Sequence, residues 1–313
     1  MPLFVSGSLA YDRIMDFPGR FADHILPEKI HILNVCFMVN GLTERFGGTA
    51  GNIAYNLALL GEKPLILATG GRDFGPYRQR LEQLGLSLEG IRLIPEEFTA
   101  GAYITTDLAD NQITGFNPGA MKYPSQYRFD GIDPNASLAI ISPGNLEDML
   151  TYSRLYKSLH LPYIFDPGQS IPAWQGTELV EMTTGALALI VNDYELELFQ
   201  AKTGLTLTRL QQCTPVLITT RGEQGSEVLT PSGKELIPAA PARRVLDPTG
   251  AGDAYRAGVL KGLILKLPWD TAARSGAVLA SFAVEQAGTQ EHQVEISAFR
   301  QRYQQTFGVP APF

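Results

Sequence analysis

Long apolar runs are absent from this sequence, since no stretch approaches the ~18 residues that a helix needs to cross a bilayer. Cysteine is scarce: only Cys36 and Cys213 are present, and no secretory leader is apparent. We therefore expect a cytoplasmic protein with reduced thiols rather than a disulfide-linked extracellular domain. Four scattered histidines and the lack of Cys-x-x-Cys pairs argue against a zinc site.

Positive charge is also limited. The chain has 25 Lys and Arg against 32 Asp and Glu, a net charge of −7, which argues against a nucleic-acid-binding surface. No Gly-x-x-x-x-Gly-Lys-Ser/Thr is present, which excludes a P-loop kinase. No Gly-x-Gly-x-x-Gly opens the first strand–helix turn, which argues against a Rossmann dehydrogenase.

What the sequence does contain is a regular alternation of short apolar runs and helical patterns. The runs lie at residues 3–5, 65–68, 138–141, 163–165, 187–191 and 216–219. Each is followed by polar or glycine-rich residues and then by apolar side chains at helical spacing. This predicts a doubly wound α/β fold with a mostly parallel sheet, helices on both faces, and ligands beyond the carboxyl ends of the strands.

Two segments interrupt the alternation. Residues 102–106 and 112–116 predict a β-hairpin, and residues 30–33 and 35–39 also look strand-like. These segments can form a small sheet that projects from the main domain. The alternative is an edge hairpin without a functional role.

The division of the chain follows from this pattern. We expect a small β-sheet from residues 13–46 and 98–118, and a main α/β domain from residues 1–12, 47–97 and 119–313.

Residues 246–258 read as a strand end, a glycine turn and a helix start. Gly250 and Gly252 have no side chains to shield the backbone at a helix N-terminus, where free N–H groups favour binding of an anion. Asp253 lies in the same first turn. It is either an ordinary cap or a carboxylate placed to deprotonate a hydroxyl beside a phosphoryl group.

Other candidate residues follow further strands. Asp12, after the first strand, is either a solvated loop carboxylate or a ligand of two adjacent hydroxyls. Asn52 should stand near the start of a helix that ends at Gly61. Asn192 and Glu195 make a capping-box pattern after the fifth strand. Arg221, after the sixth, could neutralise a phosphate or be a surface charge.

Two of these stretches resemble known signatures. Residues 247–253 closely resemble the D-T-x-G-A-G-D signature of the ribokinase-like (PfkB) carbohydrate and nucleoside kinases, with Pro248 at the second position. Residues 47–54 match that family's G-G-x-x-x-N-x-A signature. The resemblance covers essentially the full chain. It implies the ribokinase-like fold, a lid role for the small sheet, and phosphoryl transfer that depends on ATP and Mg²⁺; a monovalent cation is left open.

The resemblance also implies roles for individual residues. Asp253 would be the general base, with Gly250, Ala251 and Gly252 forming an anion hole. The implied substrate-binding residues are Ser8, Asp12, Cys36, Gly47, Gly48, Asn52, Phe116 and Gln169. The implied nucleotide-binding residues are Asn192, Thr220, Gly222, Gly225 and Ser281, and Glu195 would hold waters of the magnesium ion.

Further segments are similar to bacterial adenosine kinases of this type, which phosphorylate the ribose 5′-hydroxyl. They are residues 7–12, 17–21, 117–121, 192–195 and 288–291. Two positions depart from that pattern: Ala102 replaces an aromatic that stacks on the base, and Ala173 replaces an arginine, whereas Phe116 is retained. We therefore expect a kinase that prefers adenosine and also accepts other purine nucleosides.

Two alternatives stay open. One is a sugar kinase of the same family acting on ribose or fructose. The other is a binding or regulatory protein that has lost catalysis, although Asp253, the signature glycines and Glu195 count against it. In either kinase reading the partners are ATP and a small molecule, without nucleic acid or membrane, and the protein is a monomer or homodimer.

Overall fold

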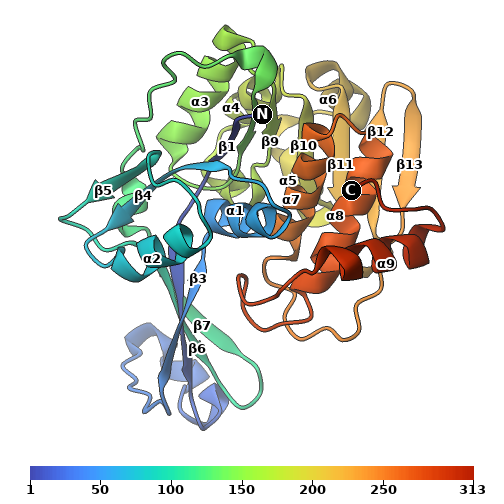
Figure 1. Cartoon of the computed structure of the whole chain (residues 1–313). Helices are drawn as coiled ribbons and strands as arrows, with labels where there is room; N and C mark the ends of the chain where they lie inside the picture. Colours follow the sequence, from blue (N-terminus) through green and yellow to red (C-terminus); the bar gives the residue numbers. More distant parts are fainter.

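The computed structural model describes all of residues 1–313. Its main feature is a nine-stranded sheet in the order β13-β12-β11-β10-β9-β8-β1-β4-β5 (Figure 1). The strands are β1 (Leu3–Ser6), β4 (Leu65–Gly71), β5 (Ile91–Ile94), β8 (Leu138–Ile141), β9 (Tyr163–Phe165), β10 (Ala188–Asn192), β11 (Val216–Thr220), β12 (Ser226–Thr230) and β13 (Gly233–Ile237). All neighbours are parallel except β11–β12 and β12–β13. Every predicted apolar run coincides with a strand, which confirms the mostly parallel α/β sheet.

Helices cover both faces of this sheet. They are α1 (Thr49–Leu59), α2 (Gly75–Gln83), α3 (Leu146–Leu159), α4 (Gly176–Thr183), α5 (Asp193–Thr203), α6 (Leu207–Cys213), α7 (Ala251–Ile264), α8 (Trp269–Ala283) and α9 (Ile296–Phe307). No helix has both the length and the apolar character needed to cross a bilayer.

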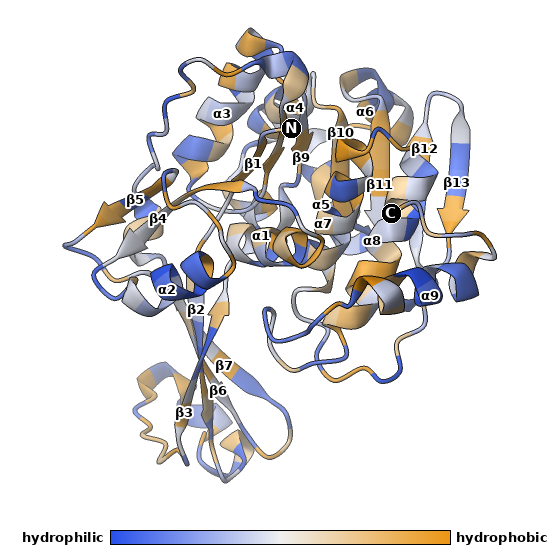
Figure 2. Ribbon diagram, viewed as in Figure 1, coloured by the Kyte–Doolittle hydropathy of each residue, from blue (hydrophilic) through white to orange (hydrophobic).

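The two faces have separate cores because successive strand residues point to opposite sides. Val5 and Ile140 pack against α1, α2, α7, α8 and α9, whereas Phe4 and Ala139 pack against α3, α4, α5 and α6. The central strands therefore bury apolar residues on both faces, and Figure 2 colours them mostly orange.

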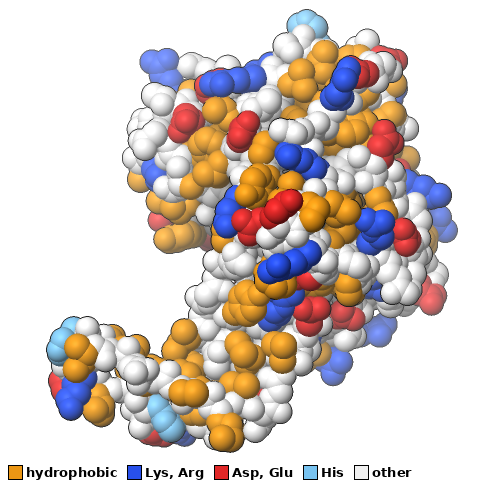
Figure 3. Space-filling view, turned by 90° about the vertical axis from the view of Figure 1, so that its left-hand side faces the viewer, with side chains coloured by type: hydrophobic (Ala, Val, Ile, Leu, Met, Phe, Trp, Pro, Cys, Tyr) orange, Lys and Arg blue, Asp and Glu red, His pale blue; other side chains and the backbone are white.

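A second sheet of four strands projects from the main body (Figures 1 and 3). Its order is β3-β2-β6-β7, with β2 (Ala10–Asp16), β3 (Leu42–Gly47), β6 (Ala100–Thr106) and β7 (Gln112–Asn117). β2 follows β1 after a short turn, so the small sheet grows directly out of the centre of the large one. The expected small sheet is thus present, with the predicted hairpin as its β6 and β7.

The strands expected at residues 30–33 and 35–39 were wrong. Pro27–Ile32 forms a 3₁₀ helix and residues 33–39 have no regular structure, while β3 begins later, at Leu42. Most apolar side chains of this segment are exposed, Ile32 and Met38 among them, so the run gains no buried strand face. Only Phe37 packs closely, with its ring 4.8 Å from that of Phe17 and 5.0 Å from that of Phe21.

Candidate active site

A cavity of about 720 Å³ lies where the carboxyl ends of the central strands meet the small sheet. Many of the predicted site residues line it: Ser8, Asp12, Gly48, Asn52, Phe116, Gln169, Glu195, Gly250 and Asp253. Gly47, Ala251 and Gly252 adjoin lining residues in sequence, and Asn192 is hydrogen-bonded to the lining residue Glu195. The rest do not line it: Cys36, Thr220, Gly222, Gly225 and Ser281. The fold therefore brings the predicted acceptor and catalytic residues together from segments far apart in the chain.

The N-terminus of α7 opens onto the cavity. Gly250 is its N-cap in the left-handed region, with φ 80°, and a Cβ there would come within 3.0 Å of Thr289. The N–H groups of Gly250 and Gly252 have no protein acceptor, whereas Ala251 N–H donates to the Pro248 carbonyl at 3.2 Å. Two of the three predicted anion-hole donors are thus free, and that of Ala251 closes the turn.

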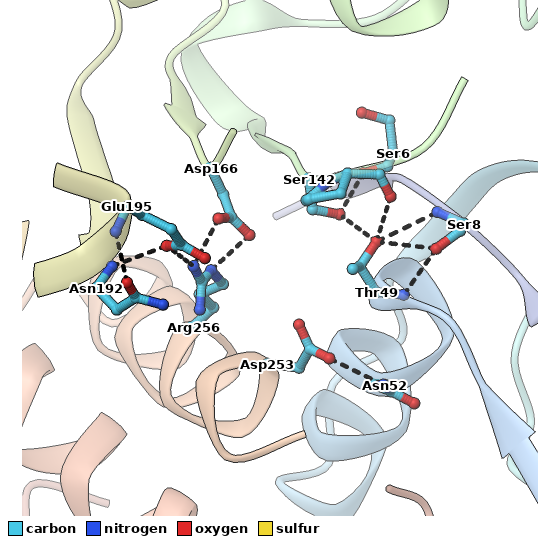
Figure 4. Close-up of polar contacts among 11 residues, drawn as sticks. Ser6, Ser8, Thr49, Asn52, Ser142, Asp166, Asn192, Glu195, Asp253 and Arg256 are labelled. Atoms are coloured by element: carbon cyan, nitrogen blue, oxygen red, sulfur yellow. Dashed lines mark hydrogen bonds and ion pairs between the residues drawn. The ribbon is translucent and has the colours of Figure 1, made fainter. Parts of the chain in front are cut away.

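Asp253 stands beside these donors in the first turn of α7. Its Oδ2 accepts a hydrogen bond from Asn52 Nδ2 at 2.8 Å (Figure 4). Burial raises the pKa of Asp253 to about 6, although Arg256 and Asn52 act in the opposite direction. A carboxylate with a pKa near 6 is ionised at neutral pH and is basic enough to accept a hydroxyl proton.

Asp12, on β2, lines the same cavity. Its carboxylate makes no hydrogen bond or ion pair within the protein, and burial raises its pKa above the usual value. A Cβ on Gly47 would lie 2.7 Å from Asp12 Oδ2, and one on Gly48, where φ is 89°, would lie 2.6 Å from the Ser8 carbonyl. Gly47 therefore makes room for a carboxylate whose acceptor capacity is unused, and Gly48 allows the backbone of residues 8–10 to pass closely.

Ser8 is held by α1. Its Oγ accepts a hydrogen bond from Thr49 N at 3.0 Å, and Thr49 Oγ1 donates to the Pro143 carbonyl at 2.6 Å (Figure 4). Thr49 lines the cavity but was not singled out in the sequence, where a threonine after two glycines carries no distinctive pattern.

Arg256, one turn after Asp253, is the functional residue that sequence reasoning missed. It is the only Lys or Arg in a lining that holds four carboxylates, Asp12, Asp166, Glu195 and Asp253. Its Nε lies 2.5 Å from Asp166 Oδ2, its Nη2 donates to Asp166 Oδ1 at 2.6 Å, and Nη2 is 4.0 Å from Glu195 (Figure 4). The one sign of Arg256 in the sequence is that it is a charged residue within a predicted helix of mostly small and apolar residues.

The Asn192–Glu195 capping box is confirmed. Asn192 Oδ1 accepts from Glu195 N at 2.7 Å, and Glu195 Oε2 accepts from Asn192 N at 2.8 Å. The same carboxylate lines the cavity, so a cap and a metal-water role are compatible.

Glu195→Gln separates these two roles. Because glutamine also completes a capping box, the melting temperature should change little. If the carboxylate also holds magnesium-bound water, the Mg²⁺ concentration for half-maximal activity should rise about 10-fold or more, in the range known for outer-shell metal partners. The matched control is Glu178→Gln in the capping box of α4, where Glu178 Oε2 accepts from Gln175 N at 3.0 Å and does not line the cavity. An identical magnesium titration for both variants would leave Glu195 as a cap alone.

The predicted nucleotide-side residues lie around the end of β11 and on α8. Gly225 has φ 87°, and a Cβ there would meet the Ile237 carbonyl at 2.0 Å. Arg221 pairs with Glu227 at 2.7 Å, and Ser281 Oγ accepts from Arg302 at 2.8 Å. These contacts give Arg221, Gly225 and Ser281 a structural role, and nucleotide binding by the predicted residues stays a prediction.

The small sheet contributes one aromatic side chain to the cavity. Phe116 on β7 is 52% exposed, pairs in register with Ala102 on β6, and both line the cavity. Cys36 is exposed on the segment before β3 and is not brought to the cavity. Gln169 lies at the rim in the turn after β9.

Comparison with known proteins agrees with this geometry. A nucleoside kinase of Methanocaldococcus jannaschii is 31% identical over 265 residues, covering 84% of this chain and 87% of that protein. The structure of Burkholderia thailandensis nucleoside kinase in complex with inosine has a TM-score of 0.86 and 39% identity, and covers 98% of this chain and 99% of its own. Its complex with ADP-inosine aligns with a TM-score of 0.84 and 39% identity, covering 99% and 97%. Residues 21–296 match the pfkB family carbohydrate kinase description. Because this match spans most of the chain, the protein belongs to the pfkB family of carbohydrate kinases.

Proposed function

We propose that this protein phosphorylates the ribose 5′-hydroxyl of purine nucleosides, with ATP as donor and adenosine as the preferred acceptor. The observation that carries the proposal is the pairing of Asp253 with the free N–H groups of Gly250 and Gly252 in one cavity. Asp253 would take the proton of the acceptor hydroxyl while these N–H groups stabilise the oxygens of the transferring phosphoryl group.

The part of the cavity around Asp12 suits a ribose. Asp12 can accept hydrogen bonds from two adjacent hydroxyls, and it makes no contact that would compete with them. Residues 13–46 and 98–118 would act as the lid over this acceptor. The related Burkholderia nucleoside kinase was solved with inosine and with ADP-inosine, which supports a purine nucleoside beside a nucleotide.

The acidic residues of the lining fit a divalent cation. Asp166 and Glu195 are hard oxygen donors at the end of the cavity where the nucleotide phosphates would lie, and Glu195 would hold magnesium-bound water. Bound Mg²⁺ would offset the charge of the ATP phosphates. Within the protein, Arg256 supplies the one fixed positive charge of this lining.

A substrate panel tests the proposal. Purified protein is incubated with ATP, Mg²⁺ and a set of nucleosides and free sugars, and ADP release is measured. We expect adenosine to give the highest kcat/KM, inosine and guanosine to be used, and ribose to be poor. Better use of ribose or fructose than of every nucleoside would replace this reading with the sugar-kinase alternative.

Phe116→Ala tests the purine site. Base–aromatic stacking contributes ~1–3 kcal/mol, so kcat/KM for adenosine should fall ~10-fold or more. Residual activity on ribose should hardly change, because ribose has no base to stack. Ile113→Ala is the matched control: Ile113 lies on the same strand and is 46% exposed, but it does not line the cavity. Equal adenosine kinetics in the two variants would remove Phe116 from base recognition.

A further inference from the structure

We infer that Gln290 is a positioning residue for phosphoryl transfer: it orients the side-chain amide of Asn52 so that its NH2 group faces Asp253. The inference rests on the proposed function, since it concerns the residue that would take the acceptor proton. Gln290 follows α8, is 1% exposed and does not line the cavity, so it acts on Asp253 only through Asn52.

The orientation of Gln290 follows from its neighbours. Its Nε2 donates to Asn52 Oδ1 at 3.1 Å and to the Tyr77 hydroxyl at 2.8 Å. The Tyr77 hydroxyl in turn donates to the Gly47 carbonyl at 2.8 Å, so its oxygen is left to accept. The Oε1 of Gln290 has no hydrogen-bond partner. What this side chain contributes is therefore its NH2 group.

The groups at the two ends of this series of hydrogen bonds set the direction of each bond within it. The Gly47 carbonyl at one end can only accept, and so can the ionised Asp253 carboxylate at the other. Tyr77 therefore donates to Gly47 and accepts from Gln290. On the other side, Asn52 donates to Asp253 and accepts from Gln290. With Oδ1 of Asn52 occupied by Gln290, Nδ2 is the group that meets Asp253, at 2.8 Å.

Gly51 provides the space for this network. A Cβ at Gly51 on α1 would lie 1.9 Å from the Tyr77 hydroxyl oxygen and 3.1 Å from Gln290 Nε2. The backbone of Gln290 is fixed as well, because Arg80 Nη2 donates to its carbonyl at 2.7 Å. The glycine before Asn52 is thus explained by the arrangement that orients Asn52.

Loss of this arrangement would affect both the orientation of the Asp253 carboxylate and its protonation. The charged groups that act on it are Arg256, which favours its ionised form, and Glu195, which opposes it, with Asp166 behind Arg256. Without the Gln290 donor, Asp253 alone orients the Asn52 amide, and once Asp253 is protonated the amide can turn its oxygen to accept from the carboxyl group. An oxygen in place of the NH2 group disfavours the carboxylate and raises its pKa.

The test compares Gln290→Glu and Gln290→Met with wild-type protein, using adenosine and ATP. Gln290→Glu keeps the shape but, when ionised, cannot donate to Asn52; Gln290→Met removes both donated bonds. For both variants kcat should fall about 10- to 100-fold, as when a reacting group is misplaced, with KM for ATP little changed. The acidic limb of the kcat–pH profile should move to higher pH. The matched control is Gln293→Met on the same loop as Gln290. It removes only a 3.4 Å hydrogen bond to the Tyr55 hydroxyl and should leave both readouts unchanged.

An acidic limb that stays in place in a folded Gln290 variant would overturn the inference, and so would a loss confined to KM for the nucleoside. If Gln290→Met does not fold, the shape-preserving Gln290→Glu decides. A wild-type protein that used no nucleoside would overturn the proposed function alone. The same profiles would then be measured with the sugar that it does use, because Asp253 would serve any acceptor hydroxyl.

Discussion

Asp253→Asn should lower kcat ~10²–10⁴-fold, because asparagine keeps the shape of the side chain but cannot accept the hydroxyl proton. ADP release with saturating ATP and adenosine measures this loss. Asp270→Asn is the matched control, since Asp270 also lies in the first turn of a helix, α8, but away from the cavity. An Asp253→Asn variant that kept more than about a third of wild-type turnover would not fit a general base.

The pKa of Asp253 adds a pH dependence to this result. Since burial raises that pKa to about 6, wild-type kcat should rise with pH through about 6 as the carboxylate ionises. The stability effect has the opposite sign. A folded-state pKa above the usual 3.8 means that Asp253 stabilises the fold at low pH and that this contribution is lost as pH rises through about 6. Asp253→Asn should therefore melt higher than wild type at about pH 8 and gain less near pH 4, which also verifies that the inactive variant is folded.

Arg256→Met should cost ~3–5 kcal/mol of the free energy of unfolding, because it leaves the buried Asp166 carboxylate without its partner. The side chains of Arg256 and Asp166 are 8% and 2% exposed. The cost should shrink at low pH, since burial already raises the pKa of Asp166 and the unpartnered carboxyl would take up a proton more readily. Denaturant unfolding at two pH values measures both effects.

Arg154→Met provides the comparison. Arg154 also contacts one carboxylate through two nitrogens, donating to Glu181 at 2.6 and 3.0 Å, but the two side chains are 58% and 38% exposed. Its removal should cost less than about 1 kcal/mol. Similar losses for the two arginines would show that burial does not set the strength of the Arg256 pair.

Local patterns were sufficient for much of the fold. The apolar runs became strands because an unbroken run of apolar residues is stable only where both faces of a strand are buried. The Asn192–Glu195 capping box also formed as predicted, since its two hydrogen bonds join residues three positions apart. The segment around Phe37 was misassigned because Phe37 packs on aromatic rings while Ile32 and Met38 stay exposed, and an apolar run by itself does not show whether it will be buried as a strand.

The sequence by itself predicted six strands of the large sheet, the glycine turn before α7 and the candidate residues Asp253, Asp12 and Asn52, because each is marked by neighbours within a few positions. Strands β5, β12 and β13, toward the edges of that sheet, were not predicted. Only the tertiary structure decided how the candidate residues combine. Asn52 and Asp253 are 201 positions apart, Asp166 and Arg256 are 90 apart, and Gln290 reaches Asn52 across 238 positions. Such hydrogen bonds and ion pairs depend on how the helices pack around the strand ends, and no local spacing encodes that packing. The same packing set the charge environment of Asp253, since burial and Arg256 both act on its pKa through space.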